Sequence, residues 1–123
     1  SSIKKVFLKS DKLKMFGFGQ EKRDYLYVDD FTNFVDLLIK KQKNNFEIFN
    51  CTYGKSFKII EILNKILKIS TQNKKIEKIK GKNINVDILV NSKKALRSLN
   101  WYPKVSIDDG LKQTIEWYKN EIL

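Results

Sequence analysis

The sequence has no histidine, one cysteine and one proline among its 123 residues. Cys51 therefore has no second thiol in the chain with which to form a disulfide or a thiolate zinc site. Low cysteine usage of this kind is typical of a reducing compartment, so we expect a cytoplasmic protein. No apolar run approaches the roughly 18 residues that a membrane-spanning helix needs. No secretory signal is recognisable after Ser1, and we expect no membrane partner.

Arginine is also scarce in a chain that is strongly basic. Lys and Arg number 25 against 14 acidic residues, a net charge of +11, yet only Arg23 and Arg97 are arginines. Proteins that read base edges favour Arg, because its planar guanidinium pairs bidentately with guanine and with phosphate. The lysines are scattered and occur with many Ile and Asn residues, which share AT-rich codons. We therefore expect a solvated lysine surface and no nucleic acid as partner.

What the chain does contain is enough apolar material for one domain over residues 1–123. Its hydrophobic fraction of 41% is ordinary for a globular protein, and a domain of this size buries roughly two thirds of its unfolded surface. Period-two patterns predict strands, which we place at 12–16, 23–28, 46–50 and 75–79, with a loop over 80–85 and an extended segment over 86–90. Strands alternating with helices indicate an α/β fold.

Apolar residues at helical spacing predict four helices. The first follows Asp29 or Asp30 as cap and buries one face, formed by Phe31, Phe34, Val35 and Leu38. The second follows Gly54 and Ser56, and the third covers Ser92 to Leu99 with Leu96 inward. The fourth begins near Ser106, where Ser106 to Asp109 resembles a capping box, and its expected inward residues are Leu111, Ile115, Tyr118 and Ile122. We also expect Trp101 and Trp117 to anchor the core.

Three segments, in this order, resemble the extended short-chain dehydrogenase/reductase family that acts on nucleotide-activated sugars. Residues Phe16 to Asp30 are similar to the family run Gly-x-Gly-x-x-x-Arg-Asp-Tyr-x-Tyr-Val-x-Asp. Phe49-Asn50, with Gly54 and Ser56 after it, resembles the Phe-Asn-Ile-Gly stretch that precedes a helix. The third segment looks like the family's closing motifs: Lys94-Ala95, Leu99-Asn100-Trp101, Pro103, Gly110-Leu111 and Thr114 to Tyr118.

The resemblance covers only the later part of that family. It implies an α/β substrate-binding domain with pieces that would complete a Rossmann sheet, the N-terminal Rossmann half being absent. The family's cofactor loop, Gly-x-x-Gly-x-x-Gly, is not in this sequence, and no Tyr is followed four positions later by a Lys. We therefore expect no catalytic residue and no cofactor in this fragment. The intact enzyme would use NAD or NADP as an epimerase, dehydratase or reductase.

The resemblance assigns substrate-binding roles to four residues. Arg23 would contact the nucleotide diphosphate through its guanidinium fork, although a surface ion pair with Asp24 or Glu21 is the alternative. Asn50 would contact substrate at a strand end or else support a turn, and Gln20 is a further candidate. Lys80 stands where the family often has the Arg of an Arg-Pro-Gly-Asp stretch, as a point charge or as part of a solvated loop.

The family role also implies partners. The expected ligand is a nucleoside-diphosphate sugar, and the alternative function is a non-enzymatic basic module for nucleic acid or other anions. Without a Rossmann half to cover them, apolar residues of the 25–50 region would be exposed, so we expect a homo-oligomer formed by domain swapping or edge pairing. The apolar residues concerned are Phe31, Phe34, Val35, Leu38, Ile48 and Phe49.

Overall fold

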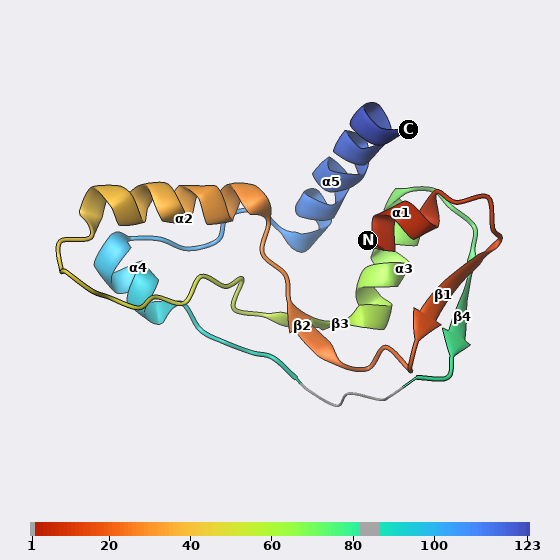
Figure 1. Cartoon of the computed structure of the whole chain (residues 1–123), viewed down its shortest axis with the longest axis horizontal. Coiled ribbons are helices and arrows are strands. Elements are labelled where there is room, and N and C mark those ends of the chain that lie inside the picture. The colour runs from red at the N-terminus through yellow and green to blue at the C-terminus, as the bar shows by residue number, and fades with distance from the viewer. Residues whose placement is uncertain (1, 82–86) are drawn as a thin grey trace.

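The computed structural model describes residues 2–81 and 87–123 as a mixed α/β fold (Figure 1). In chain order, its elements are α1 (Ser2–Val6), β1 (Lys12–Phe16), β2 (Lys22–Asp24), α2 (Val28–Lys41), β3 (Ser56–Lys58), α3 (Ile59–Ile69), β4 (Lys75–Ile79), α4 (Lys93–Leu99) and α5 (Ile107–Ile122). The expected α/β class is confirmed. The predicted residues 82–85 of the loop and Val86 of the extended segment lie outside the described residues.

Two small sheets organise the described part of the chain. β1 and β4 are parallel, with Lys12 opposite Lys75 and Phe16 opposite Ile79. β2 and β3 are antiparallel, with Arg23 opposite Phe57. Because parallel strands cannot be joined by a tight turn, the chain between β1 and β4 is long, and α3 is its last helix (Figure 1).

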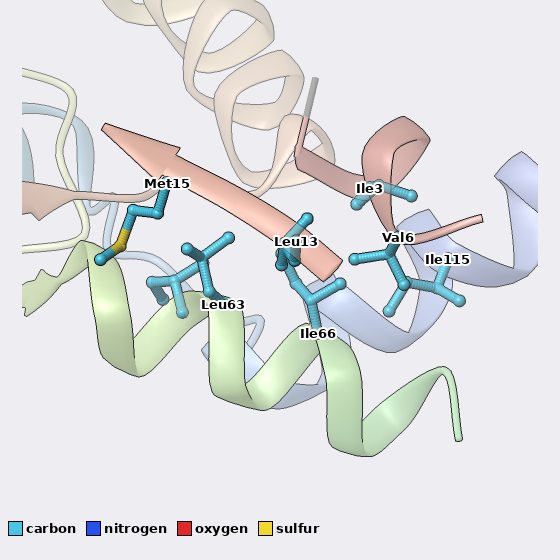
Figure 2. Close-up of a cluster of buried hydrophobic side chains, with 8 residues drawn as sticks. Ile3, Val6, Leu13, Met15, Leu63, Ile66 and Ile115 are labelled. Carbon is cyan, nitrogen blue, oxygen red and sulfur yellow. The ribbon is translucent and has the colours of Figure 1, made fainter. Parts of the chain in front are cut away.

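The first hydrophobic core lies between β1 and three helices (Figure 2). Leu13 and Met15 alternate with exposed lysines along β1 and face α3, where Leu63 and Ile66 are buried. The helix α5 adds Ile115, and α1 adds Ile3 and Val6. This packing confirms the predicted strand at 12–16, the helix expected after Gly54 and Ser56, and the inward position of Ile115 on α5.

A second core joins α2 to α4. Phe34 packs edge-on against Trp101 at a centroid distance of 5.1 Å and against Phe49 at 6.4 Å. Ala95 and Leu99 of α4 complete the cluster. Phe34 is therefore covered by its own chain, as the predicted helix face requires, which corrects the expectation that it lies on an uncovered surface. Phe31 and Val35 were predicted on the same buried face but are exposed, because no described element packs over that side of α2.

The start of α2 differs from the prediction. The strand expected at 23–28 ends at Asp24, and the helix begins at Val28 with Tyr27 as its N-cap, without a capping side chain. Neither Asp29 nor Asp30 is the cap. The buried Asp30 carboxylate instead accepts hydrogen bonds from the Lys104 and Val105 amides at 2.9 and 3.0 Å. It ties the segment before α5 to the first turn of α2.

Residues 46–50 do not form the predicted buried strand. Phe46 is 79% exposed and Ile48 is 68% exposed, whereas Phe49 is half-buried against Phe34. A strand needs a hydrogen-bonded neighbour, and no described residue pairs with this segment along a ladder. The segment is apolar, but the described chain covers only Phe49 and leaves Phe46 and Ile48 exposed. The short strand β3, by contrast, was not predicted.

Three apolar positions on the C-terminal helices were also predicted wrongly. Leu96 and Ile122 are exposed, and Trp117 is 57% exposed rather than a core anchor. Trp101 is buried as expected. The predicted cap of α5 is confirmed, since the Ser106 hydroxyl accepts a hydrogen bond from the Asp109 amide at 3.1 Å.

Candidate functional site

A glycine turn connects β1 to β2. Gly17 and Gly19 have φ values of 72° and 66°, in the left-handed region that favours glycine. A Cβ on Gly19 would lie 2.6 Å from the Met15 sulfur and 3.2 Å from Cβ of Ile60. The Gly19 carbonyl accepts a hydrogen bond from the Ile60 amide at 3.0 Å. The two glycines therefore form a turn that fixes the start of β2 against the start of α3.

Arg23 lies in the middle of β2 and is half-buried. Its cross-strand partner is Phe57 of β3. Side chains alternate along a strand, so Arg23 and Phe57 share one face of this small sheet and Asp24 faces the other. The position of Arg23 is therefore set by backbone pairing as well as by its own contacts.

The Asp24 carboxylate holds the loop that precedes β3. One of its oxygens accepts a hydrogen bond from the Tyr53 amide at 2.7 Å, and the other accepts one from the Gly54 amide at 2.8 Å. Gly54 has a φ of 81°. Two successive amides that converge on one anion form the concave backbone arrangement known as a nest. β2 and the loop over residues 50–54 are thus joined by a charged side chain.

The segment 87–91 lies beside both of these elements. The Ile88 amide donates to the Lys22 carbonyl at 3.2 Å, and the Lys22 amide donates to the Asp87 carboxylate at 3.2 Å. The Thr52 hydroxyl donates to the Val90 carbonyl at 3.1 Å. Three stretches that are distant in sequence, β2, 50–54 and 87–91, therefore form a junction at the strand that carries Arg23.

The other three residues predicted to bind substrate, Asn50, Gln20 and Lys80, lie in different parts of the structure. Asn50 is exposed, and its side-chain amide donates to the Asn91 carbonyl at 3.3 Å, so it belongs to the same junction as β2. Gln20 is exposed between the glycine turn and β2. Lys80 follows β4 and lines a separate hollow of about 400 Å³, which it shares with Gly17, Phe18, Lys78, Ile79 and Gly81.

Sequence reasoning missed the residues that hold this junction together. Asp24 entered the sequence analysis only as a possible ion-pair partner of Arg23, and the loop amides were not anticipated. Thr52 and Asp87 gave no signal, because their partners are 38 and 65 positions away. Contacts over such separations leave no periodic trace in a sequence.

Cys51 lies beside this junction and is half-buried. Desolvation, followed by the charges of Asp30 and Asp24, raises the pKa of its thiol to about 11. A thiol with such a pKa is protonated at neutral pH and is a poor nucleophile. Cys51 is thus a small packing residue.

The described residues contain no group of three or more carboxylate, thiol or imidazole side chains that could hold a metal ion. Among the helices in 2–81 and 87–123, none has both the length and the apolar content to cross a membrane. The groups that this part of the chain offers to a ligand are therefore hydrogen-bond donors and positive charges: the guanidinium of Arg23, the amides of Asn50 and Gln20, and the ammonium of Lys80.

Comparison with known proteins identifies the family. A family model described as GDP-mannose 4,6 dehydratase matches residues 2–114. A UDP-glucuronate 4-epimerase of Thermodesulfobacterium geofontis is 34% identical over 116 residues, which cover 89% of this chain and 34% of that protein. The chain thus spans about a third of the length of the curated relatives that it matches.

Solved structures agree with this assignment. The UDP-glucose 4-epimerase of Thermotoga maritima, determined with UDP-glucose, superposes with a TM-score of 0.80 at 29% identity, over 89% of this chain and 35% of that one. The UDP-glucuronic acid 4-epimerase of Bacillus cereus, determined with NAD, gives 0.80 at 27% identity, over 97% and 38%. The fold described above corresponds to the C-terminal part of such structures. The chain therefore belongs to the extended short-chain dehydrogenase/reductase family of nucleotide-sugar epimerases and dehydratases.

Proposed function

We propose that this chain is the substrate-binding part of an NAD(P)-dependent nucleotide-sugar epimerase or dehydratase. Its task is to hold the nucleoside diphosphate of the sugar substrate, so that binding energy far from the reacting carbon aligns the sugar. The support is the family membership together with the junction at β2, the strand that carries Arg23. Relatives determined with UDP-glucose and with NAD have the same fold in their matching part.

The described residues do not fit the cofactor itself. A dinucleotide site needs a glycine loop that leads from a strand into a helix, whose N-terminal amides face the pyrophosphate. Gly17 and Gly19 lie between β1 and β2, so no helix begins after them. NAD or NADP would have to be bound by a part of the family fold outside the described residues.

The observation that carries the proposal is the placement of Arg23 on a strand whose two neighbours are both fixed. β3 pairs with β2, and the Asp24 carboxylate holds the 50–54 loop against it. A guanidinium presents a rigid fork of donors that matches two phosphate oxygens. Fixing the strand reduces the side-chain and loop freedom that is lost when the anion binds.

The other candidates would have supporting roles. Asn50, at the edge of the same junction, is suited to a hydroxyl or carbonyl group of the substrate, because its amide both donates and accepts. Gln20 offers the same chemistry next to β2. Lys80 lies in the separate hollow by the glycine turn, where its ammonium would act as a point charge on the anionic ligand rather than as a fork.

The experiment is calorimetric titration of the 123-residue chain with UDP, GDP and dTDP, with uridine as a control that lacks phosphate. We expect weak binding of at least one diphosphate and none of uridine. Arg23→Lys keeps the charge but removes the bidentate geometry, and should weaken diphosphate binding by roughly 1–3 kcal/mol. The matched control is Arg97→Lys on α4. Equal titration curves for the Arg23 variant and the wild type would refute the assignment.

The basic-module alternative predicts a different order of affinities. A protein that binds through unspecific lysine charge prefers long polyanions and loses affinity steeply with salt. Random-sequence duplex DNA is therefore titrated beside the nucleotides at physiological ionic strength. Tighter binding of DNA than of any nucleoside diphosphate would favour the alternative function.

A further inference from the structure

The two charged residues of the Arg-Asp pair in β2 have separate tasks. The side chain of Arg23 lies on the face of β2 that it shares with Phe57. The carboxylate of Asp24 is engaged with the amides of Tyr53 and Gly54, at 2.7 and 2.8 Å. Hydrogen bonds of this length to an ionised carboxylate are among the stronger ones in proteins. Asp24 is therefore committed to the loop.

The turn at Tyr53 and Gly54 depends on such a partner, because neither of its two amides is paired in regular secondary structure. Residues 51–55 have no regular secondary structure, and Gly54 is exposed with a φ of 81°. A Cβ added at Gly54 would have no atom within 4 Å, so no packing surrounds the turn at that point. Two adjacent amides in this conformation point to the same side and attract an anion. Asp24 supplies that anion from within the chain.

The Asp24 carboxylate and the two loop amides that it binds, here called the Asp24 clamp, are linked to Arg23 through aromatic packing. The ring of Tyr53 lies 6.0 Å from the ring of Phe57, and the ammonium of Lys55 lies 5.4 Å from the centroid of the same ring. Phe57 is the cross-strand partner of Arg23. When Asp24 fixes the backbone at Tyr53, it also fixes the side chains that pack against the neighbour of Arg23.

We propose that Asp24 is a positioning residue for the diphosphate site, acting through the Tyr53 and Gly54 amides rather than by touching the ligand. This inference rests on the proposed function, since it concerns the same site. Its physical content is preorganisation. A loop that is already ordered in the free protein does not lose that freedom on binding. Removal of the clamp should therefore weaken ligand binding while Arg23 is intact.

The test measures UDP affinity and loop geometry in the same samples of the 123-residue chain. Asp24→Asn replaces one acceptor oxygen by an amide that cannot accept, so one of the two loop amides loses its partner. UDP affinity should fall by roughly tenfold, the equivalent of about one charge-assisted hydrogen bond. In nitrogen–proton correlation spectra, the Tyr53 and Gly54 amide signals should move upfield as their carboxylate acceptor is lost. Asp24→Glu keeps a carboxylate, so it should retain part of the UDP affinity and part of the wild-type amide shifts.

Asp36→Asn is the matched control, because it makes the same change of charge at an exposed site on α2. It should leave UDP affinity within about twofold of the wild-type value. If Asp24→Asn does not fold, Gly54→Ala replaces it. This variant strains the left-handed loop without a steric clash and should weaken UDP binding by roughly threefold to fivefold.

The outcomes separate this inference from the proposed function. Affinity that is unchanged in Asp24→Asn, although the two amide signals have moved, overturns the positioning role and leaves the function standing. Reduced affinity with unmoved amide signals also overturns it, because Asp24 would then act on the ligand directly. If the wild-type chain binds no nucleoside diphosphate at all, the proposed function fails, and the role of Asp24 in it fails too.

Discussion

Replacement of Asp30 by Asn should destabilise the fold by about 2–3 kcal/mol. Asp30 is only 5% exposed, and its two carboxylate oxygens accept hydrogen bonds from the Lys104 and Val105 amides. Asn retains one carbonyl acceptor and presents an NH₂ group to the other amide. One hydrogen bond to a charged group, with a net value of about 1.5–3 kcal/mol, is then lost, and one buried donor is left without an acceptor.

The loss would be a large part of the total stability, which is typically about 5–15 kcal/mol for a domain. For a chain of this length it corresponds to a fall in Tm of roughly 10 °C. Trp101 is a built-in reporter, because its indole donates to the Asp30 carbonyl at 3.1 Å and is buried. Urea unfolding followed by tryptophan emission gives the free energy of unfolding. Asp29→Asn, an exposed neighbour with the same charge change, is the control, and an equal effect of the two variants would refute the reasoning.

Two further predictions concern Cys51 and the surface of α2. The rate at which Cys51 reacts with iodoacetamide should rise with pH up to about 11, because desolvation and nearby carboxylates raise its pKa to that value. The pKa of Cys51 in the folded chain exceeds the roughly 8.5 of an unfolded thiol. The contribution of the protonated thiol to the free energy of unfolding is therefore complete below about pH 8.5 and is lost as the pH rises through about 11. Cys51→Ser should lack this part of the alkaline loss, and a reaction midpoint near 8.5 would contradict the assignment. The exposed apolar side of α2, where Ile39 is 80% exposed, should drive self-association that Ile39→Glu disperses and Asn33→Glu does not. Wild-type chain that stays monomeric across a concentration series in sedimentation velocity would show this expectation to be wrong.

The parts of the fold that the sequence predicts well are those with local causes. The helices α3 and α5 have continuous apolar faces, and the Ser106 cap lies three residues from its partner Asp109. The strand β1 alternates exposed lysines with the buried Leu13 and Met15. In each case, the interactions that select the structure lie within one helix or one strand.

The failures occur where the deciding partner is distant. The pattern at 46–50 is that of a strand, but strand formation depends on a neighbour that the described residues do not supply. Asp30 stands where the sequence predicts a helix cap, yet its carboxylate accepts hydrogen bonds from amides 74 and 75 positions away. Trp117 has the spacing of a core residue, but it is 57% exposed.

The candidate site shows the same division. Arg23 and Asn50 come from the family resemblance, and the structure places both at one junction, whereas Lys80 lies in a different hollow. Whether these residues bind a nucleotide stays a prediction. The Asp24 clamp crosses 29 and 30 positions, so neither periodicity nor motif spacing could predict it.

The pairing of β1 with β4 has a consequence for how the chain folds during synthesis. Lys12 and Lys75 are paired although 63 positions separate them. At about 5–20 residues per second on the ribosome, β1 waits roughly 3–13 s for its partner to be made. For most of that interval, Leu13 and Met15 have neither β4 nor α3 to cover them. Such long-range pairing slows folding, and the lysines that alternate with these two residues along β1 provide charge that opposes aggregation of the nascent strand.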